Sequence, residues 1–165
     1  MNRDPEELLS EVELAVFDFD GVFTDNTVYV MKDGREAVRC SRADGLGLRM
    51  LDRCGVKYMV LSAEVNPVVG ERCAKLKIEC RQAVNDKAAA FQEIISEFDV
   101  TASAVCYLGN DINDLGVMEL VSVPVAVADA YDAVKETAVI VLSSRGGNGA
   151  VRELCEKISR AKDSS

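Results

Sequence analysis

Acidic and polar side chains follow three apolar runs of this sequence, at the points where strands of a sheet would end. They are Asp18 and Asp20 after the first run, Ser62, Ala63 and Glu64 after the second, and Asn110, Asp111 and Asp114 after the third. Lys87 begins a segment with helical spacing. Because ligands of an open parallel sheet bind beyond the carboxyl ends of its strands, we expect these groups to share one pocket. Hard oxygen ligands bind Mg²⁺ and lysine binds phosphate, so the sequence predicts a site for magnesium and a phosphoryl group.

Asp18 and Asp20 stand two positions apart, which provides one carboxylate for attack and one for proton transfer. An ionised carboxylate beside Mg²⁺ is a competent nucleophile toward phosphorus. The second carboxylate can protonate the leaving alkoxide and then activate water. A calcium loop of the EF-hand type is excluded, because Tyr29 stands where that loop needs a glutamate. Asp111 or Asp114, taken alone, would be a helix cap more often than a metal ligand.

A parallel sheet is needed to bring these residues together, and the rest of the sequence predicts one. Five apolar runs are typical of buried strands: residues 14–19, 57–61, 104–108, 123–127 and 138–142. Segments with helical spacing lie between and after them: residues 45–53, 66–75, 86–98, 111–120, 130–136 and 149–161. The alternation of strand and helix predicts an α/β fold with right-handed crossovers.

Residues 27–40 do not follow this alternation of strand and helix, and they predict a β-hairpin. Residues 27–31 and 35–40 have the character of strands, and Lys32-Asp33-Gly34 between them has the composition of a turn. The hairpin carries three valines: Val28, Val30 and Val38. An isolated two-stranded hairpin is marginal in water, so these valines predict contact with a second copy of the chain.

Composition limits the number of domains and the partners. The chain has 165 residues, of which 48% are hydrophobic and 28% charged, and no linker divides it. We therefore expect one domain over residues 1–165, with frayed ends in the first few residues and in residues 161–165. A formal charge of −9 without a basic cluster argues against nucleic acid as a partner. No apolar run is long enough for a bilayer and no signal peptide is present, which predicts a cytoplasmic protein without a membrane partner.

The chain contains no histidine, and its six cysteines form no C-x-x-C pair. The lack of imidazole excludes serine triads, papain-like dyads and zinc sites built on histidine. We expect the cysteines to be reduced thiols that act as small buried hydrophobes, as in a cytoplasmic protein.

Four ordered motifs resemble those of the haloacid dehalogenase superfamily of phosphohydrolases. They are Asp18-x-Asp20-Gly-x-x-Thr24-Asp25, Ser62, Lys87 and Gly109-Asn110-Asp111-x-Asn113-Asp114-Leu115. The hairpin, the segment Arg42-Ala-Asp44-Gly45-Leu-Gly47 and the closing residues 146–153 resemble the small capless branch of that superfamily. The resemblance spans nearly the whole chain. It implies a three-layer, Rossmann-like parallel sheet with a hairpin after the first strand and without a cap domain.

The resemblance also implies a role for each site residue. Asp18 would be the nucleophile, and Asp20 would be the acid and base and would contact Mg²⁺ through its backbone carbonyl. The groups that would hold the phosphoryl group are Thr24, Ser62, Ala63 and Lys87. Asn110 stands where the family usually has a metal-binding aspartate. Asn110 or Asp111 would therefore complete the metal site, and Asp114 would orient Lys87 or a metal-bound water.

For the substrate, the resemblance implies a 3-deoxy-2-ulosonic sugar acid that loses its terminal phosphate through an aspartyl-phosphate intermediate. The first substrate expected is 3-deoxy-D-manno-octulosonate (KDO) 8-phosphate. An acylneuraminate or nonulosonate 9-phosphate is an alternative, because Asn148 stands where the KDO-type ending has arginine. Another alternative is a non-catalytic oligomerisation domain associated with an acylneuraminate cytidylyltransferase.

Capless members form tetramers in which the hairpin and the glycine-rich segment of neighbouring subunits complete the site. The resemblance therefore implies a homotetramer, with the segment around Arg145 to Arg152 reaching the pocket of a neighbour. The guanidinium of Arg42 or Arg145 is suited to pairing with a substrate carboxylate.

Overall fold

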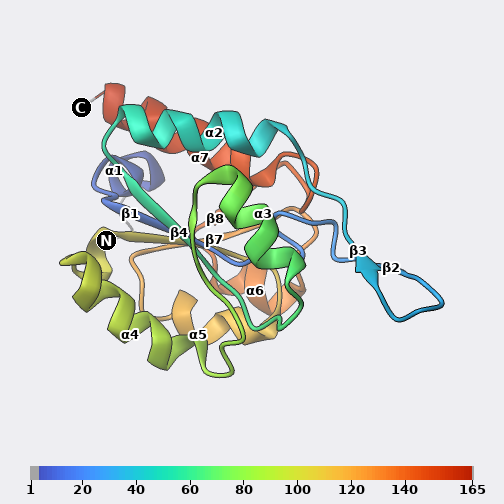
Figure 1. Cartoon of the computed structure of the whole chain (residues 1–165). Helices are drawn as coiled ribbons and strands as arrows, with labels where there is room; N and C mark the ends of the chain where they lie inside the picture. The colour runs from blue at the N-terminus through green and yellow to red at the C-terminus, as the bar shows by residue number, and fades with distance from the viewer. Residues whose placement is uncertain (1–3, 165) are drawn as a thin grey trace.

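The computed structural model describes residues 4–164, and its centre is a six-stranded parallel sheet (Figure 1). The strand order is β5-β4-β1-β6-β7-β8. The strands are β1 (Leu14–Phe17), β4 (Lys57–Leu61), β5 (Glu79–Arg81), β6 (Val105–Gly109), β7 (Val123–Ala126) and β8 (Ile140–Val141). Phe17 lies in register with Val60 on β4 and with Leu108 on β6. The residues that follow these three strands therefore leave the sheet at one edge.

Helices cover both faces of the sheet. They are α1 (Pro5–Ser10), α2 (Ala43–Arg53), α3 (Val68–Leu76), α4 (Lys87–Phe98), α5 (Leu115–Met118), α6 (Asp132–Thr137) and α7 (Ala150–Asp163). On one face α7 packs against α1 and α2, with α3 beside α2, and α4, α5 and α6 lie on the other (Figure 1). All residues of β1 and β6 are buried, which is why both sequences are apolar without alternation. The predicted α/β fold is confirmed.

The direction in which the chain crosses the sheet reverses after β5. From β1 the chain passes to β4 and β5, and then to β6, β7 and β8 on the other side of β1. The crevice between the carboxyl ends of β1 and β6 is therefore a topological switch point, where ligands of open α/β sheets bind. Asp18 and Asn110 stand at this crevice.

The predicted hairpin is present, and it projects from the body of the molecule (Figure 1). Its strands are shorter than expected, because β2 (Tyr29–Val30) pairs with β3 (Glu36–Ala37) over only 2 residues each. Val28 and Val30 are 50% and 67% exposed, whereas Val38 packs against the core. In the single chain the hairpin thus leaves two of the three valines in contact with solvent.

Both ends of the described chain are more ordered than expected. Helix α1 begins where fraying is predicted, because Asp4 caps it by accepting the Glu6 N–H at 3.0 Å. Helix α7 continues past Ala161 to Asp163. Residues 1–3 and 165 lie outside the described part, so one domain over residues 1–165 stays a prediction.

Two further expectations are wrong in detail. The segment 111–120 is a 3₁₀ turn over Ile112–Asp114 followed by the single-turn helix α5, rather than one helix.

All six thiols are free, but only three are buried, while Cys40, Cys54 and Cys80 are half-buried. The cysteines therefore belong to the core only in part.

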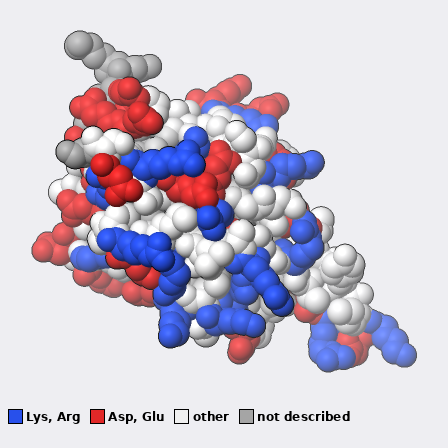
Figure 2. Space-filling view, turned by 90° about the horizontal axis from the view of Figure 1, so that it is seen from above, with Lys and Arg blue, Asp and Glu red and all other residues white. Residues whose placement is uncertain are grey.

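Charges of both signs share the face that α2 and α7 form. Figure 2 views this face and shows Lys and Arg side chains among Asp and Glu, with several Lys and Arg side chains near one another in the lower half of the view. At the tip of the hairpin Arg35 lies 2.8 Å from Asp33. Across residues 4–164, no helix combines the length and the apolar character needed to cross a membrane.

Candidate active site

A pocket of about 290 Å³ opens at the carboxyl ends of β1, β4 and β6. The residues that line it are Asp18, Asp20, Asn26, Ser62, Ala63, Glu64, Val65, Asn110, Asp111 and Asn113. The sheet therefore brings together residues from all three segments in which the sequence places polar groups after a strand. Lys87 lies beneath this pocket, against Asp18.

Lys87 joins carboxylates from two strand ends. Its Nζ is 2.7 Å from Asp18 Oδ1 and 2.8 Å from Asp114 Oδ1. Tyr107 donates its hydroxyl to Asp114 Oδ1 at 2.6 Å. All four side chains are buried. A buried ammonium held between two carboxylates has a fixed position, so it can balance charge at Asp18 without rearrangement.

Burial has the largest effect on the pKa values of this network. Burial and the charge of Asp114 outweigh Lys87 and raise the pKa of Asp18 to about 7. Burial lowers the pKa of Lys87, but Asp18 and Asp114 outweigh it and raise that pKa above its usual value. Lys87 is therefore cationic, and a further positive charge close to Asp18 would keep it an ionised nucleophile at neutral pH.

Asp20 lies in the same pocket but is less buried than Asp18. Burial raises its pKa, and the negative charge of Glu64 raises it further, while Lys87 opposes both. A carboxyl group with a raised pKa keeps its proton to higher pH, which a general acid requires. The environment of Asp20 thus suits proton transfer.

Asn110 turns its side-chain amide toward the end of β1. One amide position lies 2.9 Å from the backbone carbonyl oxygen of Asp20 and 3.1 Å from Asp18 Oδ2. With the amide oxygen in that position three oxygens face one another, whereas an amide nitrogen there would donate to both. Octahedral Mg²⁺ binds oxygens at about 2.0–2.1 Å, which puts neighbouring ligand oxygens about 2.9 Å apart. In the orientation with the amide oxygen at this position, both distances match the spacing of neighbouring magnesium ligands, and this three-oxygen cluster of Asp18, Asp20 and Asn110 fits a magnesium ion.

Asp111 and Asp114 cap the turn that follows β6. The Asp111 carboxylate accepts the Ile112 N–H at 2.7 Å, and Asp114 Oδ2 accepts the N–H of Asn110 at 2.8 Å. Asp114 thus combines the cap with the orientation of Lys87. Asp111 lines the pocket, but it does not belong to the three-oxygen cluster. Residues 4–164 contain no group of three His, Cys, Asp or Glu side chains that could hold a metal, so a metal here needs amide or carbonyl oxygens.

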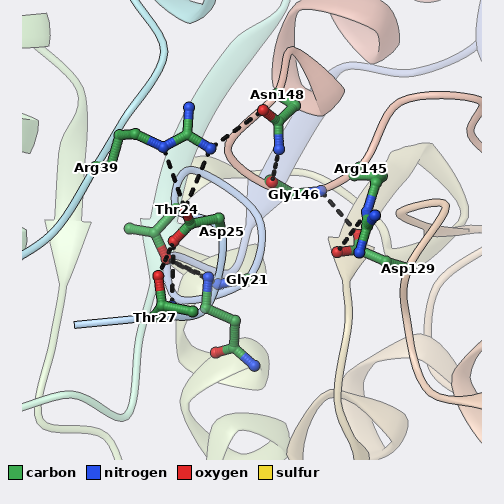
Figure 3. A network of polar contacts seen from close by, with 10 residues as sticks. Gly21, Thr24, Asp25, Thr27, Arg39, Asp129, Arg145, Gly146 and Asn148 are labelled. Atoms are coloured by element: carbon green, nitrogen blue, oxygen red, sulfur yellow. Dashed lines mark hydrogen bonds and ion pairs between the residues drawn. The ribbon is translucent and has the colours of Figure 1, made fainter.

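Thr24 shapes the loop after β1 and does not line the pocket. It is fully buried, and its Oγ1 accepts the backbone N–H of Gly21 and of Asn26, each at 3.1 Å (Figure 3). Gly21 has a φ of +83°, and a Cβ at this position would lie 2.0 Å from Asn110 Nδ2. In the single chain the Thr24 hydroxyl holds the turn that places Asp20, and a contact of Thr24 with the phosphoryl group stays a prediction.

Neither arginine expected to pair with a substrate carboxylate lines this pocket. Arg42 lies in a separate hollow, together with Arg72 and Lys75. Arg145 lies 3.4 Å from Asp129 of its own chain, and its side chain is 71% exposed (Figure 3). Within one chain, then, neither guanidinium reaches the pocket.

The glycine-rich segment packs on the loop after β1 of its own chain. Gly147 donates its N–H to the carbonyl of Val22 at 3.0 Å, and a Cβ on Gly146 would lie 1.9 Å from the Gly21 carbonyl oxygen. Arg39 joins the two segments, 3.1 Å from Asp25 and 3.2 Å from Asn148 Oδ1 (Figure 3). The backbone of this segment thus supports its own loop, and the expectation that the segment reaches a neighbour's pocket stays a prediction.

Two residues of the site have no predicted role. Tyr107 lies inside an apolar run, where nothing distinguishes it from a core residue. Glu64 lines the pocket, as its position directly after Ser62 and Ala63 at a strand end predicts, but the sequence gives it no role.

The fold and the site define a class of protein. An aspartate pair after β1, a buried lysine and acidic residues after β6 surround one pocket at a topological switch point. Residues 73–154 match the family model of the haloacid dehalogenase-like hydrolases. The chain belongs to this family, and it is a phosphoric monoester hydrolase.

Similar proteins refine this assignment. The 3-deoxy-D-manno-octulosonate 8-phosphate phosphatase KdsC of Salmonella typhi is 32% identical over 152 residues, which cover 92% of this chain and 81% of that protein. The structure of a HAD family hydrolase from Streptomyces avermitilis MA-4680 is 41% identical with a TM-score of 0.88, covering 90% of this chain and 86% of that one.

A third similar protein carries a metal. The structure of 3-deoxy-D-manno-octulosonate 8-phosphate phosphatase from Moraxella catarrhalis, in complex with a magnesium ion, a phosphate ion and a KDO molecule, is 26% identical. It has a TM-score of 0.92 and covers 96% of this chain and 92% of its own. Together with the three-oxygen cluster, it supports a divalent metal as the cofactor.

Proposed function

We propose that this chain is a Mg²⁺-dependent phosphatase that removes the terminal phosphate of a 3-deoxy-2-ulosonic sugar acid. The observation that carries the proposal is the buried pair of Asp18 and Lys87 beside three oxygens that fit magnesium. KDO 8-phosphate is the first candidate substrate, since the relative from Salmonella typhi is named for it. A nonulosonate 9-phosphate is the second, because Asn148 replaces the arginine of the KDO-type ending.

In the proposed mechanism each side chain has one task. Asp18 Oδ2 belongs to the three-oxygen cluster, which leaves Oδ1, beside Lys87, to attack phosphorus. Attack forms an aspartyl-phosphate and breaks the bond between phosphorus and the substrate oxygen. Asp20 gives its proton to the leaving alkoxide and then takes one from the water that hydrolyses the aspartyl-phosphate. When bound, Mg²⁺ would neutralise charge on the phosphoryl oxygens and on Asp18.

The phosphoryl group would be held by the wall that follows β4. Ser62 and Ala63 line the pocket there, where a hydroxyl and a backbone N–H are suitable donors to phosphate oxygens. Ser62 is buried, and its Oγ accepts the Glu64 N–H at 3.1 Å, which leaves its proton to donate. Phosphate binding thus combines this wall with Lys87.

A panel of phosphate esters assayed with Mg²⁺, and with the metal removed by EDTA, tests the proposal. We expect the highest kcat/KM on KDO 8-phosphate and loss of turnover with EDTA. A higher kcat/KM on a nonulosonate 9-phosphate would favour the second candidate. If no phosphate ester is hydrolysed in Mg²⁺, the proposed function is wrong, and a non-catalytic role would replace it.

Asn110→Asp should strengthen magnesium binding. The change adds one negative charge to a cluster of hard oxygens, so the half-saturating Mg²⁺ concentration should fall by roughly tenfold. Activity and the magnesium-induced rise in Tm, each titrated with MgCl₂, both measure it. Asn113→Asp is the matched control, because Asn113 lines the same pocket outside the cluster. Equal effects of the two substitutions would place Asn110 outside the metal site.

The active form is proposed to be a homotetramer that covers the hairpin. Val28→Ser with Val30→Ser should shift the molar mass from light scattering toward the single chain, because both side chains are at least half exposed without a partner. Val141→Ser is the control, since this valine on β8 is 48% exposed. A parent chain that is monomeric and fully active, and that keeps its activity with Arg145→Ala, would refute a site shared between subunits.

A cytoplasmic location likewise stays a prediction.

A further inference from the structure

Asp44 is a buried carboxylate outside the pocket that the proposed mechanism does not use. It lies in the first turn of α2, and only 1% of the residue is exposed. Among the described residues, no hydrogen bond of ordinary geometry ends on either of its carboxylate oxygens. Because burial of a carboxylate without partners is costly, we expect a positive charge or a dipole beside it.

The dipole beside Asp44 is the N-terminus of α7. Helices α2 and α7 lie side by side (Figure 1). A Cβ on Gly47, one turn after Asp44 on α2, would lie only 3.0 Å from Arg152 Cα. Helix α7 begins after Gly149, which has no side chain to cap it. The first N–H groups of a helix have no partner within it and carry partial positive charge, so Asp44 lies at the end of α7 that attracts an anion.

The electrostatics of Asp44 agree with this position. Burial raises the pKa of Asp44 to about 7, whereas the Arg152 backbone N–H and the charge of Arg72 both lower it. Arg152 is the third residue of α7, and its N–H is one of those that a capping side chain accepts. Asp44 on α2 thus replaces the cap that Gly149 cannot provide.

The residues just before α7 transmit its position to the loop after β1. Gly147 donates its N–H to the Val22 carbonyl at 3.0 Å, and a Cβ on Gly147 would lie 2.4 Å from the backbone nitrogen of Asp25. A Cβ on Gly146 would lie 1.9 Å from the Gly21 carbonyl oxygen. Since backbone meets backbone at each of these places, a shift of the α7 N-terminus would move the loop.

The loop after β1 in turn sets the spacing of the three-oxygen cluster. Gly21 follows Asp20 directly, and a Cβ on Gly21 would lie 2.0 Å from Asn110 Nδ2. The Asp20 carbonyl oxygen lies 2.9 Å from the amide position of Asn110 in the cluster. A shift of Gly21 would therefore change this distance, and Mg²⁺ demands near-ideal spacing of its ligands.

We propose that Asp44 is a positioning residue for the metal site: it caps α7 and so holds the glycine-rich segment, the loop after β1 and the Asp20 carbonyl in place. This inference rests on the proposed function and deepens it. Asp44 touches neither the metal nor the substrate, and it acts only through these backbone contacts.

Magnesium binding by two variants of Asp44 tests this proposal. Asp44→Ala should raise the Kd for Mg²⁺ by roughly tenfold, because it removes the cap and leaves every oxygen of the cluster present. Asp44→Asn keeps an oxygen that can accept the Arg152 N–H, so it should retain most of the parent affinity. Isothermal titration calorimetry with MgCl₂ measures the Kd without any turnover.

Ile158→Val separates positioning from stability. Ile158 is fully buried on the same helix, about two turns after its start. Removal of one buried methylene should lower the Tm, as loss of a cap does. Because the N-terminus of α7 is unchanged, the Kd for Mg²⁺ should stay that of the parent chain.

The parent chain offers a test without substitution, which applies even if Asp44→Ala does not fold. Coupling between two sites is reciprocal, so Mg²⁺ should slow backbone hydrogen exchange at residues 146–153 as well as in the loop after β1. Protection that is confined to the residues lining the pocket would contradict the proposal.

Two further results would overturn the inference in a chain that binds Mg²⁺: a parent-like Kd in folded Asp44→Ala, or equal increases in Kd for Asp44→Ala and Ile158→Val. A parent chain that binds no Mg²⁺ would instead overturn the proposed metal site, and this inference with it.

Discussion

Asp18→Asn is expected to lower kcat on every phosphate ester by at least about 10⁴-fold, because an amide cannot attack phosphorus. The fold should persist. Asp18 is buried, and its pKa is raised to about 7 by burial and by Asp114, so replacing it with a neutral group removes a charge that is costly to bury. Lys87 keeps Asp114 as its partner at 2.8 Å. Single-turnover kinetics, with circular dichroism and Tm on the same sample, measure both effects.

The control for Asp18→Asn is the same substitution at Asp52. Asp52 lies near the end of α2 on the surface, 3.0 Å from Arg49, and it lies outside the pocket. Asp52→Asn should keep the parent kcat. Turnover within about tenfold of the parent by a folded Asp18→Asn chain would exclude a covalent aspartyl-phosphate.

The middle of the sheet could be predicted from the sequence because its strands are buried on both faces. β1 and β6 are continuous apolar runs, so both the strands and the polar residues that follow them are visible in the sequence. β5 is not visible, since it has 3 residues and two of them, Glu79 and Arg81, are charged. Its pairing with β4 depends on the sheet already being in place.

The roles of single residues are harder to predict than the place of the site. A threonine hydroxyl can donate to phosphate or accept from backbone amides, and only the folded loop decides that Thr24 does the second. The ring of Tyr107 belongs to the core because β6 is buried, whereas its hydroxyl donates to Asp114 in the network around Lys87. Whether Gly146 and Gly147 meet their own chain or a neighbour depends on the direction of the chain after β8, which no local pattern encodes.

Asp20→Asn is expected to lower kcat on a sugar-acid phosphate by about 10²–10⁴-fold, which is the usual contribution of a general acid and base. Burial and the charge of Glu64 raise the pKa of Asp20, so the parent carboxyl can hold the proton that the leaving alkoxide needs. Asparagine cannot supply it. The metal contact proposed for Asp20 is its backbone carbonyl, 2.9 Å from the Asn110 amide position, and the substitution does not remove this group. Half-saturation by Mg²⁺ should therefore stay unchanged.

The order of the two chemical steps makes this prediction sharper. With p-nitrophenyl phosphate the leaving group departs with little protonation, so Asp20→Asn should still form the aspartyl-phosphate. It should release nitrophenolate in a burst close to one equivalent of enzyme and then stall, because no carboxylate activates water for the second step. Asp18→Asn should give no burst. A steady rate equal to that of the parent chain on a sugar-acid phosphate would remove Asp20 from the mechanism. If Asp20→Asn loses both the burst and the steady turnover of p-nitrophenyl phosphate, Asp20 is needed before the bond to phosphorus breaks. Its role would then be to position the substrate or Asp18.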